Sequence, residues 1–242
     1  MRVYLAGVEG SSDIIKKIKP KNLLMSYYSL HNKSLEKIVN YLGYNVNIFL
    51  DSGAFTAYTQ KKVIDIHKYI RYIKKYKKYI HLYANLDVIG DADKTKINQK
   101  IMENEQLKPL PTYHFGEPEE YLDYYLNNYN YIALGALVND KRNKKRKTNL
   151  IKKSVLKAKK RNVKIHLFGI TDAAIIKKYY DFIYSVDSTS WLSGSRFGNC
   201  YFFERGSLKN KKLNNFNVLK HDKIDLWNLI QWKKFSDYMG EK

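Results

Sequence analysis

Short apolar runs rich in β-branched and aromatic residues alternate along the chain with longer, Lys-rich segments in which apolar residues recur every three or four positions. The short runs predict strands and the longer segments predict helices. Eight strand runs are present, and they begin at Arg2, Asn22, Asn45, His81, Leu110, Tyr131, Val163 and Phe182. Strands that alternate with helices form parallel sheets. The pattern therefore predicts an α/β fold, a compact (β/α)8 barrel of the TIM type.

The rest of the chain supports a single domain. Helices are expected between the strands, over residues 11–19, 33–42, 65–79, 94–106, 118–128, 144–161 and 171–180. The stretch "WLSGSRFGN" from Trp191 predicts a loop. Residues 222–239 predict a closing amphipathic helix with four apolar side chains inward: Leu226, Leu229, Ile230 and Phe235. We expect one domain over residues 1–242, with the barrel to about residue 198 and a C-terminal loop and helix over residues 199–242.

Two protein classes lose ground on composition. No run approaches the roughly 18 apolar residues of a membrane span, and the N-terminus turns polar too soon for a signal peptide. We therefore expect a cytoplasmic protein without a membrane partner. Cys200 is the only cysteine of the chain, which excludes an internal disulfide and a cysteine-based zinc cluster.

The charge balance points to a partner. Lys and Arg number 44 against 23 Asp and Glu, a formal net charge of +21. An excess of this size predicts a polyanion, DNA or RNA. A charged surface that serves solubility alone is the alternative.

Polar residues end the predicted strands, where barrels of this kind place their sites. They are Asp51, Asp87, His114, Gly135, Gly169 and Asp187. A turn is served by Gly, Asn or Ser, so three acids exceed what turns need. Each has a structural alternative: Asp51 as a turn cap, Asp187 as a partner of its own loop through Ser188 or Thr189, and His114 as a satisfied core or rim residue. Asp91 or Asp93 is a better helix cap than Asp87.

Three carboxylates indicate acid/base or nucleophilic chemistry. The six His residues show no HxH or HExxH spacing, which argues against zinc, although Mg²⁺ bound by carboxylates stays open. The chain has no Walker loop, GxSxG elbow or GxGxxG fingerprint. We expect no cofactor.

Seven motifs, taken in order, resemble those of the tRNA-guanine transglycosylase superfamily. They are "DSGAF", "NLDVI", "PTYHFGE", "IALGAL", "HLFGI", "SVDSTSW" and "SGSRFGN". The chain is most similar to the small branch that acts on DNA, the DNA 7-deazaguanine transglycosylases, over roughly residues 46–199. The tRNA enzymes carry a Cys-Cys-Cys-His zinc subdomain that a single cysteine cannot build.

The resemblance implies roles for these residues. Asp187 would be the nucleophile, Asp51 the acid/base, and Asp87 the reader of the guanine edge. Gly135 and Ala136 would approach the base through their backbone, although the family has a second Gly where this chain has Ala136. The other residues expected around the base are Ser52, Gly53, Phe55, Gly169 and His114, which stands where the tRNA enzymes have Gln. Phe55 or Tyr113 would stack on the base.

The implied reaction replaces guanine in DNA with a 7-deazaguanine derivative, and a free base such as a cyano- or aminomethyl-deazaguanine is the second substrate. Lys141, Arg142 and Arg196, with basic helices such as "KKYKKY" from Lys74, would hold phosphates. Three alternatives stay open: the same reaction on tRNA, a non-catalytic nucleic-acid-binding barrel, and a hydrolase or lyase acting on a small anionic substrate.

Overall fold

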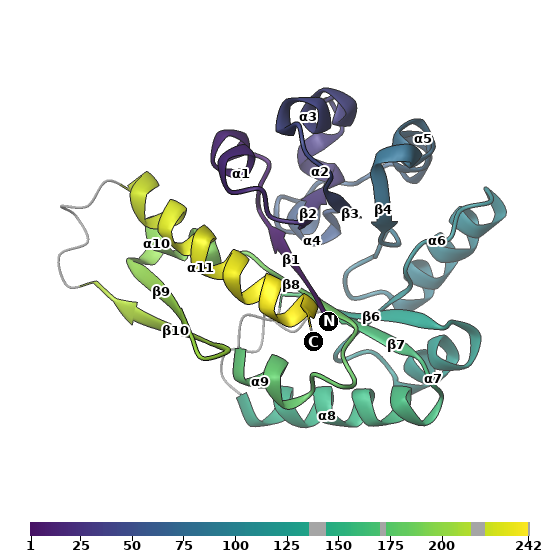
Figure 1. Cartoon of the computed structure of the whole chain (residues 1–242). Coiled ribbons are helices and arrows are strands. Elements are labelled where there is room, and N and C mark those ends of the chain that lie inside the picture. Colours follow the sequence, from purple (N-terminus) through teal and green to yellow (C-terminus); the bar gives the residue numbers. More distant parts are fainter. Residues whose placement is uncertain (136–143, 170–172, 214–220, 242) are drawn as a thin grey trace.

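The structure is a computed structural model, and it describes residues 1–135, 144–169, 173–213 and 221–241. Eight strands form one curled sheet in the order β4-β3-β2-β1-β8-β7-β6-β5, and every neighbouring pair is parallel (Figure 1). The strands are β1 Arg2–Ala6, β2 Asn22–Ser26, β3 Asn47–Asp51, β4 Ile80–Tyr83, β5 Thr112–His114, β6 Tyr131–Gly135, β7 Lys164–Leu167 and β8 Ser185–Ser188. The expectation of eight parallel strands alternating with helices is confirmed.

The closed barrel is not found. No ladder joins β4 to β5 in the described residues, and the two edges meet only at an isolated parallel bridge between Ala84 and Leu110. Its hydrogen bonds run from Asn85 N to Leu110 O (3.0 Å) and from Leu110 N to Tyr83 O (2.9 Å). On either side of this bridge the backbone bonds elsewhere: Lys108 N–H donates to the Tyr83 hydroxyl (2.7 Å), and Pro111 O accepts from Ala133 N–H of β6 (2.8 Å).

Helices follow the strands as the sequence predicts, with boundaries set by capping. They are α1 Ser12–Ile18, α2 Tyr27–Leu30, α3 Leu35–Leu42, α4 Ala54–Thr59, α5 Ile66–Tyr76, η1 Lys77–Tyr79, α6 Ala92–Asn104, α7 Glu119–Asn128, α8 Lys144–Lys160, α9 Ala173–Lys178, η2 Ser190–Leu192, α10 Ser193–Phe197 and α11 His221–Glu241. In α5, the Asp65 side chain accepts from the N–H groups of His67 and Lys68 and caps the first turn. The short helices α2, α4 and α10 were not predicted. Within the described ranges, no helix combines the length and hydropathy needed to cross a membrane.

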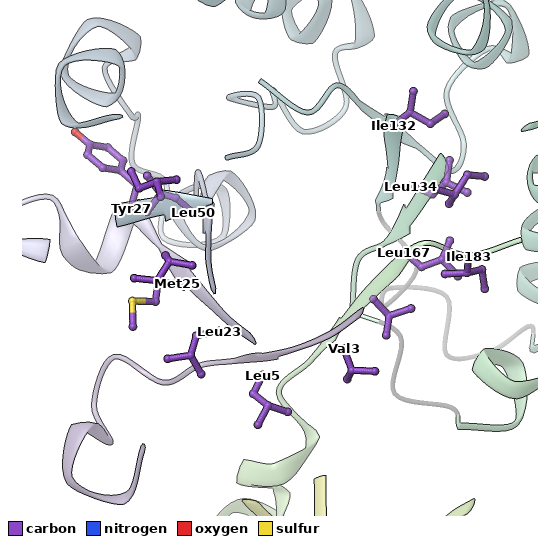
Figure 2. Packing of buried hydrophobic residues seen from close by; sticks show 14 of the residues in the cluster. Val3, Leu5, Leu23, Met25, Tyr27, Leu50, Ile132, Leu134, Leu167 and Ile183 are labelled. Carbon is purple, nitrogen blue, oxygen red and sulfur yellow. The ribbon is translucent and has the colours of Figure 1, made fainter. Parts of the chain in front are cut away.

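The two faces of the sheet carry different side chains. The outer face packs against the helices, and Figure 2 shows this layer with Val3, Leu5, Leu23, Met25 and Leu167 among its members. The inner face carries a smaller apolar cluster of Tyr4, Ala6, Leu24, Phe49, Ala84, Leu110 and Ala133. Side chains alternate between faces along a strand. Asp51, His114, Gly135 and Asp187 therefore share the inner face.

The C-terminal part is only partly as predicted. Trp191–Asn199 was expected to be a loop but is mostly η2 and α10, and an antiparallel hairpin of β9 (Asn199–Glu204) and β10 (Ser207–Lys212) follows. The closing helix is present as α11, with Leu229 and Phe235 buried as expected. Leu226 and Ile230 are only partly buried. Polar Asn228 and Gln231 are buried on this helix instead, because they bond the β9 backbone at Tyr201 N (2.8 Å) and Phe203 N (3.1 Å).

Candidate functional site

Acidic side chains gather at the carboxyl end of the sheet, on its inner face. Asp51 ends β3 and Asp187 is the third residue of β8, as predicted. Asp87 does not end its strand: β4 stops at Tyr83, and Asp87 lies in the loop before α6. Glu9, in the loop after β1, also lies close to Asp51. The charges of Asp87, Asp187 and Glu9 each add to the effect of burial and raise the pKa of Asp51.

Asp51 is a turn cap as well as a candidate reagent. The Gly53 N–H donates to Asp51 Oδ2 at 2.9 Å, and Gly53 adopts a φ of +79° that glycine tolerates best. A side chain at Gly53 would lie 2.4 Å from Ser26 Oγ. Burial is the main effect that raises the pKa of Asp51, to about 7. The charges of neighbouring carboxylates also raise this pKa, whereas the hydrogen bond from Gly53 lowers it. A carboxyl group with this pKa can both give and take a proton near neutral pH.

Asp187 is held by groups on β7 and after it. Gly169 N–H donates to Asp187 Oδ1 at 2.9 Å, and His166 Nε2 lies 3.3 Å from the same oxygen. The alternative role, a bond to its own loop through Ser188 or Thr189, is not seen among the described residues, where Asp187 accepts from Gly169. Gly169, which was expected to lie around the base, donates its backbone N–H to the Asp187 carboxylate.

A buried chain of polar groups leads to Asp187, and sequence reasoning missed it. Tyr131 OH lies 2.6 Å from Ser185 Oγ, which lies 2.6 Å from His166 Nδ1. His166 is fully buried, and its Nε2 forms no hydrogen bond with any residue that the structure describes, although Asp187 Oδ1 lies 3.3 Å away. The alternation of side chains along β7 and β8 could have predicted this contact, because it places His166 and Ser185 on the inner face of neighbouring strands.

Asp87, His114 and Glu117 form a second cluster, in which each side chain is at most 10 % exposed. His114 Nε2 lies 3.3 Å from Asp87 Oδ2, and Nδ1 lies 3.1 Å from Glu117 Oε1. Burial lowers the pKa of His114, but the two carboxylates outweigh it and raise the pKa to about 10. His114 is therefore an imidazolium at neutral pH, and it draws the Asp87 loop to the end of β5.

One oxygen in this cluster has no partner. Asp87 Oδ1 is buried and accepts no hydrogen bond within the described part of the chain. Leaving a carboxylate oxygen unpaired in a buried place is costly. A donor from a ligand would satisfy it.

The residues expected around a base meet different outcomes. Ser52 is buried, and its hydroxyl accepts from Ala54 N–H (3.3 Å), while Phe55 is exposed on α4. Gly135 makes room for His114, since a side chain there would lie 2.6 Å from the ring. Tyr113 is wrong as a stacking residue, because it lies in the outer core and donates to Glu117 O. Phe168 was missed: it is partly exposed on the inner face, 4.5 Å between ring centres from His166.

The basic residues expected to hold phosphates fall into three groups: one exposed and unpaired within the described residues, some outside the described residues, and some paired with acids. Arg196 is exposed on α10 and forms no ion pair with a described residue. Ala136, Lys141 and Arg142 lie outside the described residues. Lys74 and Lys78 of "KKYKKY" pair with Glu105 (2.5 Å) and Glu36 (3.3 Å).

The described side chains include no group of three or more His, Cys, Asp or Glu arranged to hold a metal ion. The candidate site is thus a set of carboxylates with two imidazoles, at the carboxyl end of a curled parallel sheet. No protein-family model matches the chain, and no curated protein matches it.

Proposed function

We propose that the chain is a base-exchange transglycosylase that replaces guanine in DNA with a 7-deazaguanine derivative, within a (β/α)8 barrel whose edges meet at the Ala84–Leu110 bridge. The observation that carries the proposal is the division of three neighbouring carboxylates among three environments. Asp51 has a pKa raised to about 7, Asp187 is held by a backbone N–H, and Asp87 keeps a buried oxygen free. Environments that separate carboxyl groups in this way are typical of acid/base and nucleophile pairs.

Asp187 is the nucleophile in this scheme. Its Oδ1 is engaged by Gly169 N–H, which leaves Oδ2 to attack C1′ of the target nucleotide. The new Oδ2–C1′ bond forms as the C1′–N9 bond to guanine breaks, through an oxocarbenium-like state. The sugar is then held covalently while the base leaves.

Asp51 moves the proton. In its protonated form it gives the proton to the departing guanine, and as the carboxylate it takes the N9 proton of the incoming base. That base then attacks C1′ and releases Asp187, so each turnover returns both carboxylates to their first state. A pKa of about 7 suits both directions, because each form is well populated near neutral pH.

Asp87 selects the base. Its free Oδ1 accepts from the N1–H and exocyclic amine edge that guanine and 7-deazaguanine share, a charge-assisted contact. Adenine offers no N1–H and leaves the oxygen unpaired, at about 1–3 kcal/mol. The imidazolium of His114 fixes the other oxygen.

The test is incorporation of labelled guanine into DNA or tRNA at matched salt. We expect the wild type to incorporate label into DNA, and Asp187→Asn and Asp51→Asn to incorporate none. Asp181→Asn, a matched change at an exposed acid, should incorporate label at the wild-type level. Better uptake by tRNA would overturn the choice of polymer. Absence of label in both would overturn the reaction.

The covalent step has its own test. Denaturation during turnover with DNA should leave a protein–DNA adduct in the wild type and in Asp181→Asn, and none in Asp187→Asn. An adduct that survives Asp187→Asn but disappears in Asp51→Asn would reverse the two roles.

A further inference from the structure

A basic hollow of about 490 Å³ lies on the outer flank of the protein, between the loop after α2 and helix α5. Its floor is formed by Tyr27, Tyr72 and Tyr76, which are buried. Its rim carries exposed cations and polar groups: His31, Asn32, Lys33, Ser34, Lys68, Arg71 and Lys75. The hollow is separate from the carboxylates of the candidate site.

The cations of this rim are not neutralised by the protein. Lys33, Lys68, Arg71 and Lys75 form no ion pair with any residue that the structure describes, whereas Lys74 and Lys78 of the same segment do. Two acids feel these charges without pairing with them. Asp65 accepts from two backbone N–H groups as the α5 cap, and these bonds together with the charges of Lys68 and Arg71 lower its pKa. Hydrogen bonds from Tyr79 and Lys78 lower the pKa of Glu36, and the charge of Lys75 contributes to this.

The spacing puts three of these cations on one helix face. Lys68, Arg71 and Lys75 stand at i, i+3 and i+7 of α5, so they are neighbours along one stripe. Like charges at such spacing repel one another and destabilise a helix. A bound anion would relieve that repulsion.

The hollow begins at the same end of the sheet as the carboxylates. The His31–Ser34 loop follows β2 and α2, and the last residue of β2, Ser26, pairs in register with Asp51 and donates to Glu9 Oε1 (2.5 Å). Helix α5 runs back from this end toward the start of β4, so Lys68 lies nearest the site and Lys75 farthest from it. The His31–Ser34 side of the hollow therefore follows the strand that pairs with β3, whose last residue is Asp51.

We propose that this hollow binds the phosphodiester backbone of the polynucleotide substrate next to the target nucleotide. The proposal rests on the proposed function for the identity of the polymer and on charge complementarity for the contact. Each phosphate neutralised releases counterions, so the contact makes affinity fall with salt. It supplies position and affinity, while the base is read elsewhere.

The experiment compares two triple variants that remove the same charge. Lys33→Gln/Lys68→Gln/Arg71→Gln removes three unpaired cations of the hollow, and Lys74→Gln/Lys78→Gln/Lys157→Gln removes three lysines that are paired with Glu105, Glu36 and the α7 acids. The affinity of each full-length variant for a labelled DNA oligonucleotide is measured as a function of salt. The log–log slope of the hollow variant should become shallower by about 2.7 on duplex, or about 2.1 on a single strand, if all three cations contact phosphate. The control slope should stay near that of the wild type, and equal changes in the two variants would overturn the proposal.

Exchange assays separate this proposal from the proposed function. At saturating DNA, the hollow variant should keep the wild-type turnover with a raised KM for DNA. If the wild type exchanges guanine and the hollow variant has an unchanged KM and slope, the hollow proposal fails alone. If the wild type exchanges no base while the hollow variant still loses DNA affinity, the reaction fails and the hollow stands. Tighter binding of anionic vesicles than of DNA at the same residues would overturn the polynucleotide as the occupant.

Discussion

The candidate site contains two carboxylate–imidazole pairs, and they differ in the second group that contacts the ring. In both, a His Nε2 lies 3.3 Å from an Asp oxygen: His114 from Asp87 and His166 from Asp187. Behind His114 is a second carboxylate, Glu117, whereas behind His166 is the hydroxyl of Ser185. A carboxylate only accepts, while a hydroxyl can donate or accept.

The difference gives the two aspartates different freedom. Two acids raise the pKa of His114 against its burial and hold it in its charged form, so Asp87 lies beside a fixed cation. Ser185 leaves His166 able to carry its proton on Nε2, facing Asp187, without requiring a second charge there. The first arrangement suits a group that reads a base, and the second suits a group that must form and release a covalent bond.

Breaking the first pair should have the larger effect. His114→Asn leaves Asp87 and Glu117 buried without their cation, and removing one partner of a buried pair costs about 3–5 kcal/mol. Urea denaturation at pH 7 measures the loss, with His67→Asn, an exposed His on α5, as the control. An equal, small change in both variants would contradict the ion-pair cluster.

The same pair predicts a pH dependence. His114 has a folded pKa near 10 against 6.5 in the unfolded chain, so the folded state binds the proton more tightly. Its contribution to the free energy of unfolding is complete below about pH 6.5 and is lost as pH rises toward 10. Denaturation from pH 6 to 10 should show this decline in the wild type and a flatter curve in His114→Asn.

Breaking the second pair should change rate rather than binding. His166→Asn removes the imidazole whose Nε2 lies 3.3 Å from Asp187 Oδ1, and we expect a fall in rate of roughly tenfold, or about 1.4 kcal/mol. We expect kcat to fall with KM for the incoming base unchanged, and His166→Gln to recover part of the loss. His114→Asn should instead raise that KM. A rise of KM in both variants would show that the two pairs do not differ in role.

The effect of opposite sign is expected at Asp51, which has no imidazole partner within the described residues. Its folded pKa of about 7 lies above the unfolded value of 3.8, so the folded state loses stability as pH rises from about 4 to 7. Asp51→Asn should therefore be more stable than the wild type at pH 7.5, by up to about 4 kcal/mol for a shift of roughly three pKa units, and nearly equally stable near pH 4. Thermal unfolding at the two pH values measures this, and a less stable variant at pH 7.5 would refute it.

Local patterns predicted the parts of the molecule that depend on them. Alternating apolar positions located the strands, and their ends located Asp51, Asp187 and His114. Contacts between distant segments were not predictable in this way. Glu9 joins the site through Ser26, and the β9–β10 hairpin is held by Asn228 and Gln231, 27 and 28 residues beyond their partners. Tyr113 was misplaced because a shift of one position changes the face of a strand.

The single bridge between β4 and β5 sets where the protein opens. Two hydrogen bonds join the edges at Ala84 and Leu110, while five residue pairs join β2 to β3. Local opening follows the lowest-energy break in a structure. The amide protons of Asn85 and Leu110 should thus exchange with solvent sooner than those inside β1, β2 and β3. Since Asp87 lies two residues past Asn85, the most easily loosened part of the sheet lies beside the group that we propose reads the base.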